Sequence, residues 1–246
     1  MIFYFIELPE AASTNSVAAS GSFAYNSVVY TLCQSAGRGC GKNSWESEPG
    51  KNIAMTMVLG DMGVSIQSQF AISMAVALGC YDYLSGYLEG VSVKWPNDIY
   101  VGDKKIAGIL IEHSITGATL SRSLCGVGMN INQELFVSDA PNPVSLKQLV
   151  GIDFDVREEL KKLVNAISIR LESVTNYDLL RSEFMRNIFR KDGVWGWRDE
   201  SGEFSAHIVG IDDFGRLQLQ LQSGEIRTYG FKEIRYIGAP NSFVKE

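Results

Sequence analysis

Three groups of polar residues interrupt otherwise apolar segments, and each carries side chains that can bind an anion. The first is the loop "QSAGRGCGKNSW", residues 34–45, which combines glycines with Arg38 and Lys42. The second is "KWPND", residues 94–98, and the third is Lys105 within "KKIAG". Guanidinium and ammonium groups bind phosphate oxygens, and glycines let a backbone approach a ligand closely. Together these groups predict a cationic pocket for a small anionic ligand.

The glycine-rich loop fits neither common phosphate fingerprint. The Walker pattern is absent, and Gly41 arrives one residue too early for G-x-G-x-x-G. Taken singly, each group also has an ordinary structural interpretation: Asn97 and Asp98 are typical turn residues. Lys105 would be a solvated hairpin lysine, and Arg38 a surface arginine. Their joint occurrence on short β connections favours one shared pocket.

The composition limits the function classes. The chain has 246 residues and a net charge of −6, which argues against non-specific nucleic-acid binding. Its four cysteines form no C-x-x-C pair and its two histidines have no metal-ligand spacing, so no protein metal site is predicted. No apolar run is long enough to cross a membrane, and the first residues lack the features of a signal peptide. A reduced, cytoplasmic compartment is therefore expected.

The elements that must position these groups can be predicted from periodicity and turn residues. Strands are expected before and after the loop, a core helix after them, then a hairpin turning at Gly102-Asp103, a further strand and two helices. A strand, a turn at Pro9 and a short helix precede them, and Ser13 or Thr14 is expected to cap this helix. Asp155, followed by Glu158, is expected to start a later helix in the manner of a capping box. The ranges are 3–20 (strand and helix), 27–35, 51–60, 65–86 (helix), 91–95, 99–112, 123–132, 154–174 (helix) and 177–190 (helix).

Two further patterns complete the sequence-level description. Gly126 and Gly128 lie inside a predicted strand, which suggests close approach of a backbone or a ligand. From about Glu203 onward, short strands follow one another at regular spacing, as in a small barrel or sandwich. We therefore divide the chain into a catalytic-type domain, 1–195, and a small β domain, 196–246.

Four motifs resemble the biotin–protein ligase family, in its order and spacing. They are "STN" (13–15), "QSAGRG…W" (34–45), "KWPNDIYVGDKKIAGILIE" (94–112) and "GVGMNIN" (126–132). The resemblance implies an α+β fold with a mixed, largely antiparallel sheet and flanking helices, of the class II aminoacyl-tRNA synthetase-like biotin/lipoate ligase type. It also implies a C-terminal SH3-like β-barrel. The chain starts at the catalytic domain, so it is similar to the monofunctional members, and no DNA partner is expected.

The resemblance implies a two-step, AMP-forming reaction. Biotin and ATP, with Mg²⁺ carried by the nucleotide, would give biotinyl-5′-AMP and pyrophosphate. A lysine of a biotin carboxyl carrier protein domain, in acetyl-CoA carboxylase or a related carboxylase, would then take the biotin. No membrane partner is expected, and monomer and homodimer both stay open.

The same resemblance assigns roles to residues of this sequence. Arg38 and Lys105 would be catalytic cations, and Asp98 would orient or deprotonate the incoming lysine. The biotin-binding set would be Ser13, Thr14, Asn15, Gln34, Gly37, Arg38, Gly39, Cys40, Lys105 and Gly108. The ATP- and adenylate-binding set would be Arg38, Trp45, Lys94, Asn97, Lys105 and Asn130.

Two alternatives and one departure stay open. A ligase for lipoate or octanoate shares the general fold, and a non-catalytic biotin-binding module would use the same pocket. The family loop usually runs G-R-G-x-x-G, with arginine at the second x, whereas Cys40 and Gly41 occupy those positions here and Lys42 replaces the third glycine. We hypothesise that Lys42 supplies the missing charge from a shifted position, and that this loop retains the adenylate less tightly.

Overall fold

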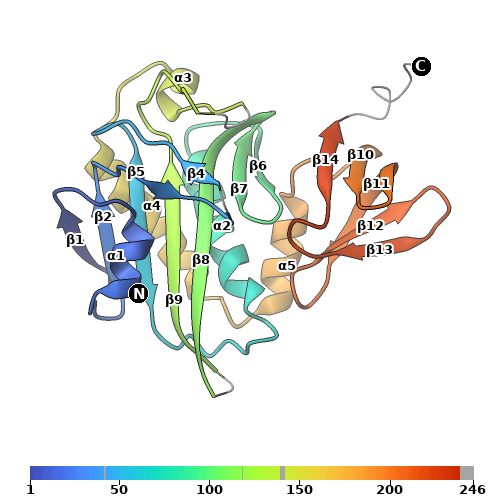
Figure 1. The fold of residues 1–246 in the computed structure, drawn as a ribbon, viewed down its shortest axis with the longest axis horizontal. Helices are drawn as coiled ribbons and strands as arrows, with labels where there is room; N and C mark the ends of the chain where they lie inside the picture. Colours follow the sequence, from blue (N-terminus) through green and yellow to red (C-terminus); the bar gives the residue numbers. More distant parts are fainter. Residues whose placement is uncertain (42, 118, 139–141, 239–246) are drawn as a thin grey trace.

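A computed structural model describes residues 1–41, 43–117, 119–138 and 142–238. Two large β-sheets, a third sheet of two short strands and flanking helices make up this part of the chain (Figure 1). The main sheet contains, in spatial order, β1 (Tyr4–Leu8), β2 (Ser27–Thr31), β5 (Ile53–Leu59), β9 (Thr119–Met129), β8 (Lys104–Thr116), β7 (Asp98–Val101) and β6 (Val91–Lys94). The helices are α1 (Thr14–Ser20), α2 (Phe70–Ser85), α3 (Leu146–Val150), α4 (Val156–Leu171) and α5 (Tyr177–Arg186).

The pairing of the main sheet confirms a mixed, largely antiparallel arrangement. Strand β1 runs parallel to β2, and every other neighbouring pair is antiparallel. The predicted hairpin turn is present between β7 and β8, where Gly102 has a φ of 56°, a value that favours glycine. This hairpin brings Asp98 and Lys105 to the same end of the sheet.

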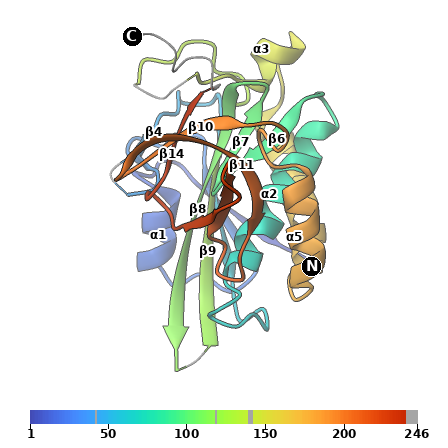
Figure 2. The same cartoon turned by 90° about the vertical axis from the view of Figure 1, so that its right-hand side faces the viewer.

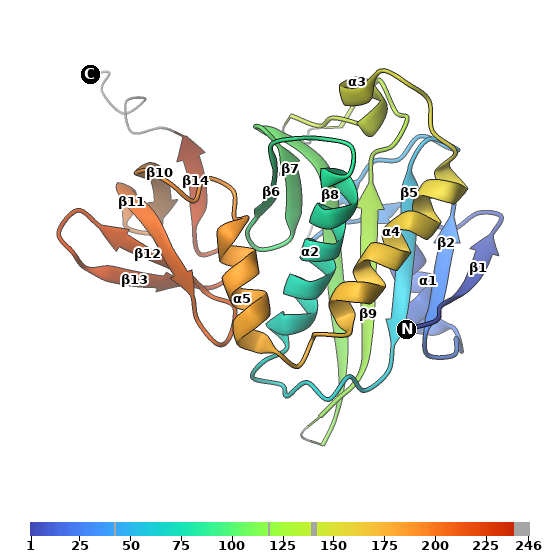
Figure 3. The same ribbon diagram turned by 180° about the vertical axis from the view of Figure 1, so that it is seen from behind.

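Helices cover the two faces of the sheet differently. Helix α1 lies on one face, and α2, α4 and α5 lie on the other (Figures 1 and 3). The predicted core helix is α2, which begins at Phe70 and is buried over most of its length because its apolar residues leave no polar face. It packs so closely on α4 that a Cβ at Gly79 would lie 2.5 Å from the Ile167 Cα. The opposite face carries α1 and the loop of residues 34–45 (Figure 1).

Helix starts follow the sequence in part. Ser13 stands at the N-cap position of α1, but its side chain accepts no capping hydrogen bond from the described first-turn amides, so the expected cap is wrong. Asp155 does cap α4, because its carboxylate accepts from the backbone N–H groups of Arg157 and Glu158. The reciprocal capping box is found instead at α3, between Ser145 and Gln148.

A buried carboxylate joins the helices behind the sheet. Glu159 of α4 is 3% exposed and accepts hydrogen bonds from Tyr83 (2.6 Å), Tyr87 (2.7 Å) and Lys162 (2.8 Å). Desolvation of the carboxylate opposes ionisation, but these hydrogen bonds outweigh it and hold the pKa of Glu159 below its ordinary value. Glu159 is therefore an ionised anchor between α2 and α4.

The second sheet forms the C-terminal module (Figure 2). Its strands, in spatial order, are β13 (Ile226–Tyr229), β12 (Leu217–Leu221), β11 (Gly202–Ile211), β10 (Trp195–Asp199) and β14 (Arg235–Gly238). The sequence pattern indicated strands only from about Glu203 and so missed β10. The module forms a hydrogen bond with the main domain: Trp95 Nε1 donates to the Gly215 carbonyl at 2.8 Å. The division at residue 196 stays a prediction.

Candidate active site

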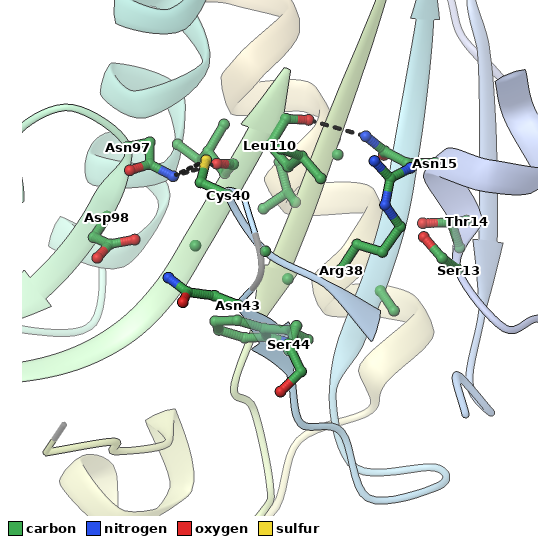
Figure 4. A pocket seen from close by; sticks show the side chains of 18 of the residues that line it. Ser13, Thr14, Asn15, Arg38, Cys40, Asn43, Ser44, Asn97, Asp98 and Leu110 are labelled. Atoms are coloured by element: carbon green, nitrogen blue, oxygen red, sulfur yellow. Dashed lines mark hydrogen bonds between the residues drawn. The ribbon is translucent and has the colours of Figure 1, made fainter. Parts of the chain in front are cut away.

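A cavity of about 220 Å³ opens on the sheet face that α1 occupies. Strands β3 (Gly37–Arg38) and β4 (Ser44–Trp45) pair as a small hairpin that crosses in front of β5, β9 and β8 (Figure 1). This hairpin forms one wall, the start of α1 a second, and the ends of β7 and β8 a third (Figure 4). The lining residues predicted from sequence are Ser13, Thr14, Asn15, Gln34, Arg38, Gly39, Cys40, Trp45, Asn97, Asp98, Lys105 and Gly108.

The glycines of the floor are explained by two side chains that lie on them. A Cβ at Gly128 would lie within 2.5 Å of the Trp45 Nε1 atom, and one at Gly108 would lie 3.0 Å from the same ring. A Cβ at Gly126 would overlap the amide of Asn15. In this structure side chains, rather than a backbone, approach these strand glycines. Gly126 and Gly128 also line the cavity, so the close approach of a ligand stays a prediction.

One end of the cavity is a network of polar groups. The Thr56 hydroxyl lies 2.6 Å from Asn15 Oδ1 and 2.9 Å from the Thr14 hydroxyl, and all three residues are buried. The backbone N–H of Thr14 donates to Gln34 Oε1 at 3.0 Å, and Asn15 Nδ2 donates to the Leu110 carbonyl at 3.1 Å. Because these side chains hold one another, their hydrogen-bonding groups are positioned in advance for a ligand.

Among the described residues, the cations Arg38 and Lys105 line the cavity, and each is paired with a carboxylate. Arg38 Nη2 lies 2.9 Å from Glu112 Oε1, and Lys105 Nζ lies 2.7 Å from Asp98 Oδ1. Glu112 also accepts a hydrogen bond from Asn15 Nδ2 at 3.0 Å, so it joins Arg38 to the polar end. An incoming phosphate would compete with these carboxylates for the same cations.

The Cys40 thiol of the loop accepts a hydrogen bond from the "KWPND" segment. Asn97 Nδ2 donates to Cys40 Sγ at 3.1 Å and to the Ile109 carbonyl at 2.6 Å (Figure 4). Burial, assisted by the charge of Asp98, raises the pKa of the Cys40 thiol above its ordinary value. Cys40 is therefore a neutral contact of the loop at physiological pH and not a thiolate nucleophile.

Three predicted residues do not line this cavity. Lys94 Nζ donates to the Tyr100 hydroxyl at 2.9 Å, and burial lowers the pKa of the lysine. Asn130 is 3% exposed and donates to the Val144 carbonyl, while its Oδ1 has no partner among the described residues. Gly37 is packed against Trp45, where a side chain would overlap the backbone. Their predicted binding roles stay predictions.

The structure also adds residues that the sequence did not assign. Thr56 interrupts the apolar strand "IAMTMVL", and that polar residue in a buried strand was the available signal. Glu112 ends the motif "KKIAGILIE", but nothing in its spacing indicated a partner for Arg38. Phe231 reaches the cavity from the C-terminal module, which no sequence pattern indicated. The hypothesis on Lys42 lies outside the described residues.

Comparison with known proteins decides the family. The chain is 30% identical over 200 residues to the biotin–[acetyl-CoA-carboxylase] ligase of Paracoccus denitrificans, covering 78% of this chain and 82% of that protein. The chain belongs to the biotin–protein ligase family. The sequence model of the biotin/lipoate A/B protein ligase family matches residues 11–130, and that of the biotin protein ligase C-terminal domain matches residues 198–234.

Other members of the biotin–protein ligase family agree with this assignment. The bifunctional ligase/repressor of Bacillus subtilis is 26% identical over 208 residues, and the chain spans 62% of its length. The Aquifex aeolicus biotin protein ligase, solved in complex with biotin and ATP, superposes with a TM-score of 0.80 at 22% identity. That superposition covers 96% of this chain and 99% of the other, and it confirms the biotin protein ligase fold. Among the described residues, no helix is long and apolar enough to cross a membrane.

Proposed function

We propose that this protein activates biotin with ATP and transfers it to a lysine of a biotin carboxyl carrier protein domain. The main support is the cavity itself. It has a preorganised polar end, where Thr14 and Asn15 are held by Thr56, and it is also lined by the cations Arg38 and Lys105. A ligand with a polar head at one end and a carboxylate at the other fits this arrangement. Family membership supports biotin as that ligand.

In the first step, a biotin carboxylate oxygen attacks the α-phosphorus of ATP. The new C–O–P bond gives biotinyl-5′-AMP, and pyrophosphate leaves with the electrons of the broken P–O bond. Two unit charges about 4 Å apart repel by roughly 4 kcal/mol at an effective dielectric of about 20. Arg38 and Lys105 offset this repulsion, because the guanidinium matches phosphate oxygens and the ammonium acts as a compact charge.

Biotin would be held by complementary polar and apolar walls. The polar groups of Ser13, Thr14, Asn15 and Gln34 would hydrogen-bond the ureido ring, while lining residues such as Met55 would contact its apolar part. A site with buried polar groups rejects an analogue that leaves them unpaired. Lipoate has no ureido group, and this difference favours biotin over the lipoate or octanoate alternative.

The nucleotide would bind on the side of Trp45. Its buried Nε1 has no partner among the described residues, so it can donate to a ligand, and its ring offers a stacking surface. We propose that Asn97 and Asn130 support the adenine, and Lys94 the nucleotide more remotely. Mg²⁺ would arrive on the phosphates: no cluster of three or more His, Cys, Asp or Glu side chains suited to a metal occurs among the described residues.

In the second step, the acceptor lysine amine attacks the carbonyl carbon of the mixed anhydride. The amide bond forms, AMP leaves with the electrons of the C–O bond, and the amine loses a proton. Asp98 lines the cavity and is the carboxylate that can orient the amine or accept this proton. No covalent enzyme intermediate is needed, which agrees with the neutral Cys40 thiol.

The test is formation of the adenylate. ATP labelled in its α-phosphate is incubated with the protein and Mg²⁺, together with biotin in one reaction and lipoate in another. We expect labelled biotinyl-5′-AMP with biotin and only background with lipoate. Adenylate from lipoate alone would replace the proposal by the lipoate alternative. Biotin binding with no labelled product, and no AMP release when a carrier domain is added, would instead support a non-catalytic module.

A further inference from the structure

The tip of the C-terminal module, residues 230–233, meets the glycine-rich loop. Phe231 lines the catalytic cavity. Its neighbour Lys232 lines an adjoining cavity of about 740 Å³ between the module and the main domain, which shares Cys40, Asn43 and Pro96 with the first. Lys232 therefore stands just outside the space that Arg38 and Lys105 line.

Lys232 fills the space that a side chain at position 41 would need. Gly41 has a φ of 71°, and a Cβ built on it would overlap the Lys232 ammonium. The loop thus carries no side chain at this position, and a cation from another part of the chain occupies its place. The same ammonium is close enough to Cys40 for its charge to act on the thiol.

Lys232 has a backbone conformation that residues other than glycine seldom adopt, in a turn closed by the Glu233 N–H, which donates to the Gly230 carbonyl at 3.2 Å. Its φ is 71°, in the left-handed region where glycine is favoured and a long side chain costs free energy. Strained conformations of this kind are found where the side chain has a function. Glycine would fit this turn position with less strain, which makes glycine a suitable replacement for testing the charge of Lys232.

The ammonium of Lys232 is also not paired with a carboxylate among the described residues. Arg38 and Lys105 are each paired with a carboxylate, whereas Lys232 forms no ion pair with a described carboxylate. A described contact of its ammonium is with the ring of Phe231, at 5.5 Å from the centroid. An exposed cation beside a phosphate-binding loop raises the local concentration of anions.

We propose that Lys232 binds the pyrophosphate end of ATP and takes the place of a cationic side chain at position 41. This inference rests on the proposed function. In this arrangement Arg38 and Lys105 face the biotin carboxylate and the α-phosphate. Lys232, in the adjoining cavity, faces the pyrophosphate that leaves. The C-terminal module thereby contributes directly to nucleotide binding.

The experiment measures equilibrium binding of a non-hydrolysable ATP analogue, of pyrophosphate and of AMP, by calorimetry. The variants are Lys232→Gly, which keeps the backbone unstrained, and Lys232→Gln, which keeps the side-chain length. The matched control is Lys161→Gln, an exposed lysine on α4 behind the sheet. Thermal unfolding of each variant checks the fold, and we expect Lys232→Gly to be at least as stable as the parent.

We expect both Lys232 variants to bind the ATP analogue and pyrophosphate about tenfold more weakly, as for one lost charged hydrogen bond, with AMP binding within about twofold of the parent. The control should match the parent for all three ligands. Unchanged affinity for the analogue, or an equal loss for AMP, would overturn the inference. These readouts do not depend on biotin transfer, so a parent protein that binds the analogue but forms no adenylate would contradict only the proposed function.

Discussion

Replacing Asp98 with asparagine should change the two half-reactions in opposite directions. Asp98 has two roles in this account: it is paired with Lys105 at 2.7 Å, and it would orient or deprotonate the acceptor amine. Asparagine has the same shape but no charge, so it releases Lys105 and cannot accept a proton. Adenylate formation should therefore become more favourable while transfer fails.

The geometry of the pair gives the size of each effect. At 2.7 Å and an effective dielectric of about 20, the attraction between the Lys105 and Asp98 charges is roughly 6 kcal/mol. Both side chains are 22% exposed, and hydration of the freed lysine cancels most of this attraction. We expect ATP affinity to rise by up to about tenfold. Loss of a general base should slow transfer by about 100-fold or more.

The two steps can be measured separately. Adenylate formation is followed by exchange of labelled pyrophosphate into ATP, and transfer by mixing preformed biotinyl-5′-AMP with protein and a carrier domain. The control is Asp103→Asn on the same hairpin, an aspartate that is paired with Arg190 at 2.7 Å outside the cavity. It should leave both rates near those of the parent. Equal loss of both half-reactions in Asp98→Asn would refute the reasoning, because Asp98 would then only support the position of Lys105.

Three further changes test other parts of the structure. Glu112→Gln removes a partly exposed carboxylate that competes with the adenylate for Arg38, and this ion pair contributes up to about 1 kcal/mol. Adenylate dissociation should therefore slow by up to about fivefold in a filter-binding chase. Faster dissociation would contradict this. Gly128→Ala should displace Trp45, because the new Cβ would overlap its ring. ATP binding measured by titration calorimetry should weaken by about ten- to a hundredfold. Unchanged affinity would show that Trp45 does not contact the nucleotide. Glu159→Gln should lower the free energy of unfolding by about 2 kcal/mol at neutral pH. Because the folded pKa of Glu159 is lowered, this stabilisation is present above the ordinary glutamate pKa and is lost as pH falls through the folded value; a pH-independent difference in urea unfolding would count against it.

Much of the fold could be predicted from local patterns. Helix α2 is apolar along its length, and the hairpin at Gly102 combines two apolar runs with a turn residue, so periodicity and turn chemistry sufficed for both. Local patterns do not locate the ends of the elements as well. A serine before a helix can either cap the helix or bind a ligand, and the sequence does not distinguish the two roles. In the structure Ser13 lines the cavity and does not cap α1.

The candidate site could be predicted as a set of residues but not as a set of contacts. Arg38 and Lys105 were expected to share a pocket, and the structure brings them together. Their pairing with Glu112 and Asp98 depends on sheet register, which links residues far apart in the chain. Lys232 shows the limit most clearly, because its position depends on how a separate module packs against the loop, and no local pattern contains that information.

The proposed transfer of biotin can be followed directly in the intact mass of an acceptor domain. A purified biotin carboxyl carrier protein domain is incubated with this protein, biotin, ATP and Mg²⁺, and its intact mass is measured beside a reaction without ATP. We predict an increase equal to one biotin less one water, at a single lysine and only when ATP is present. An unchanged acceptor mass, while an active ligase modifies the same domain under the same conditions, would contradict the account.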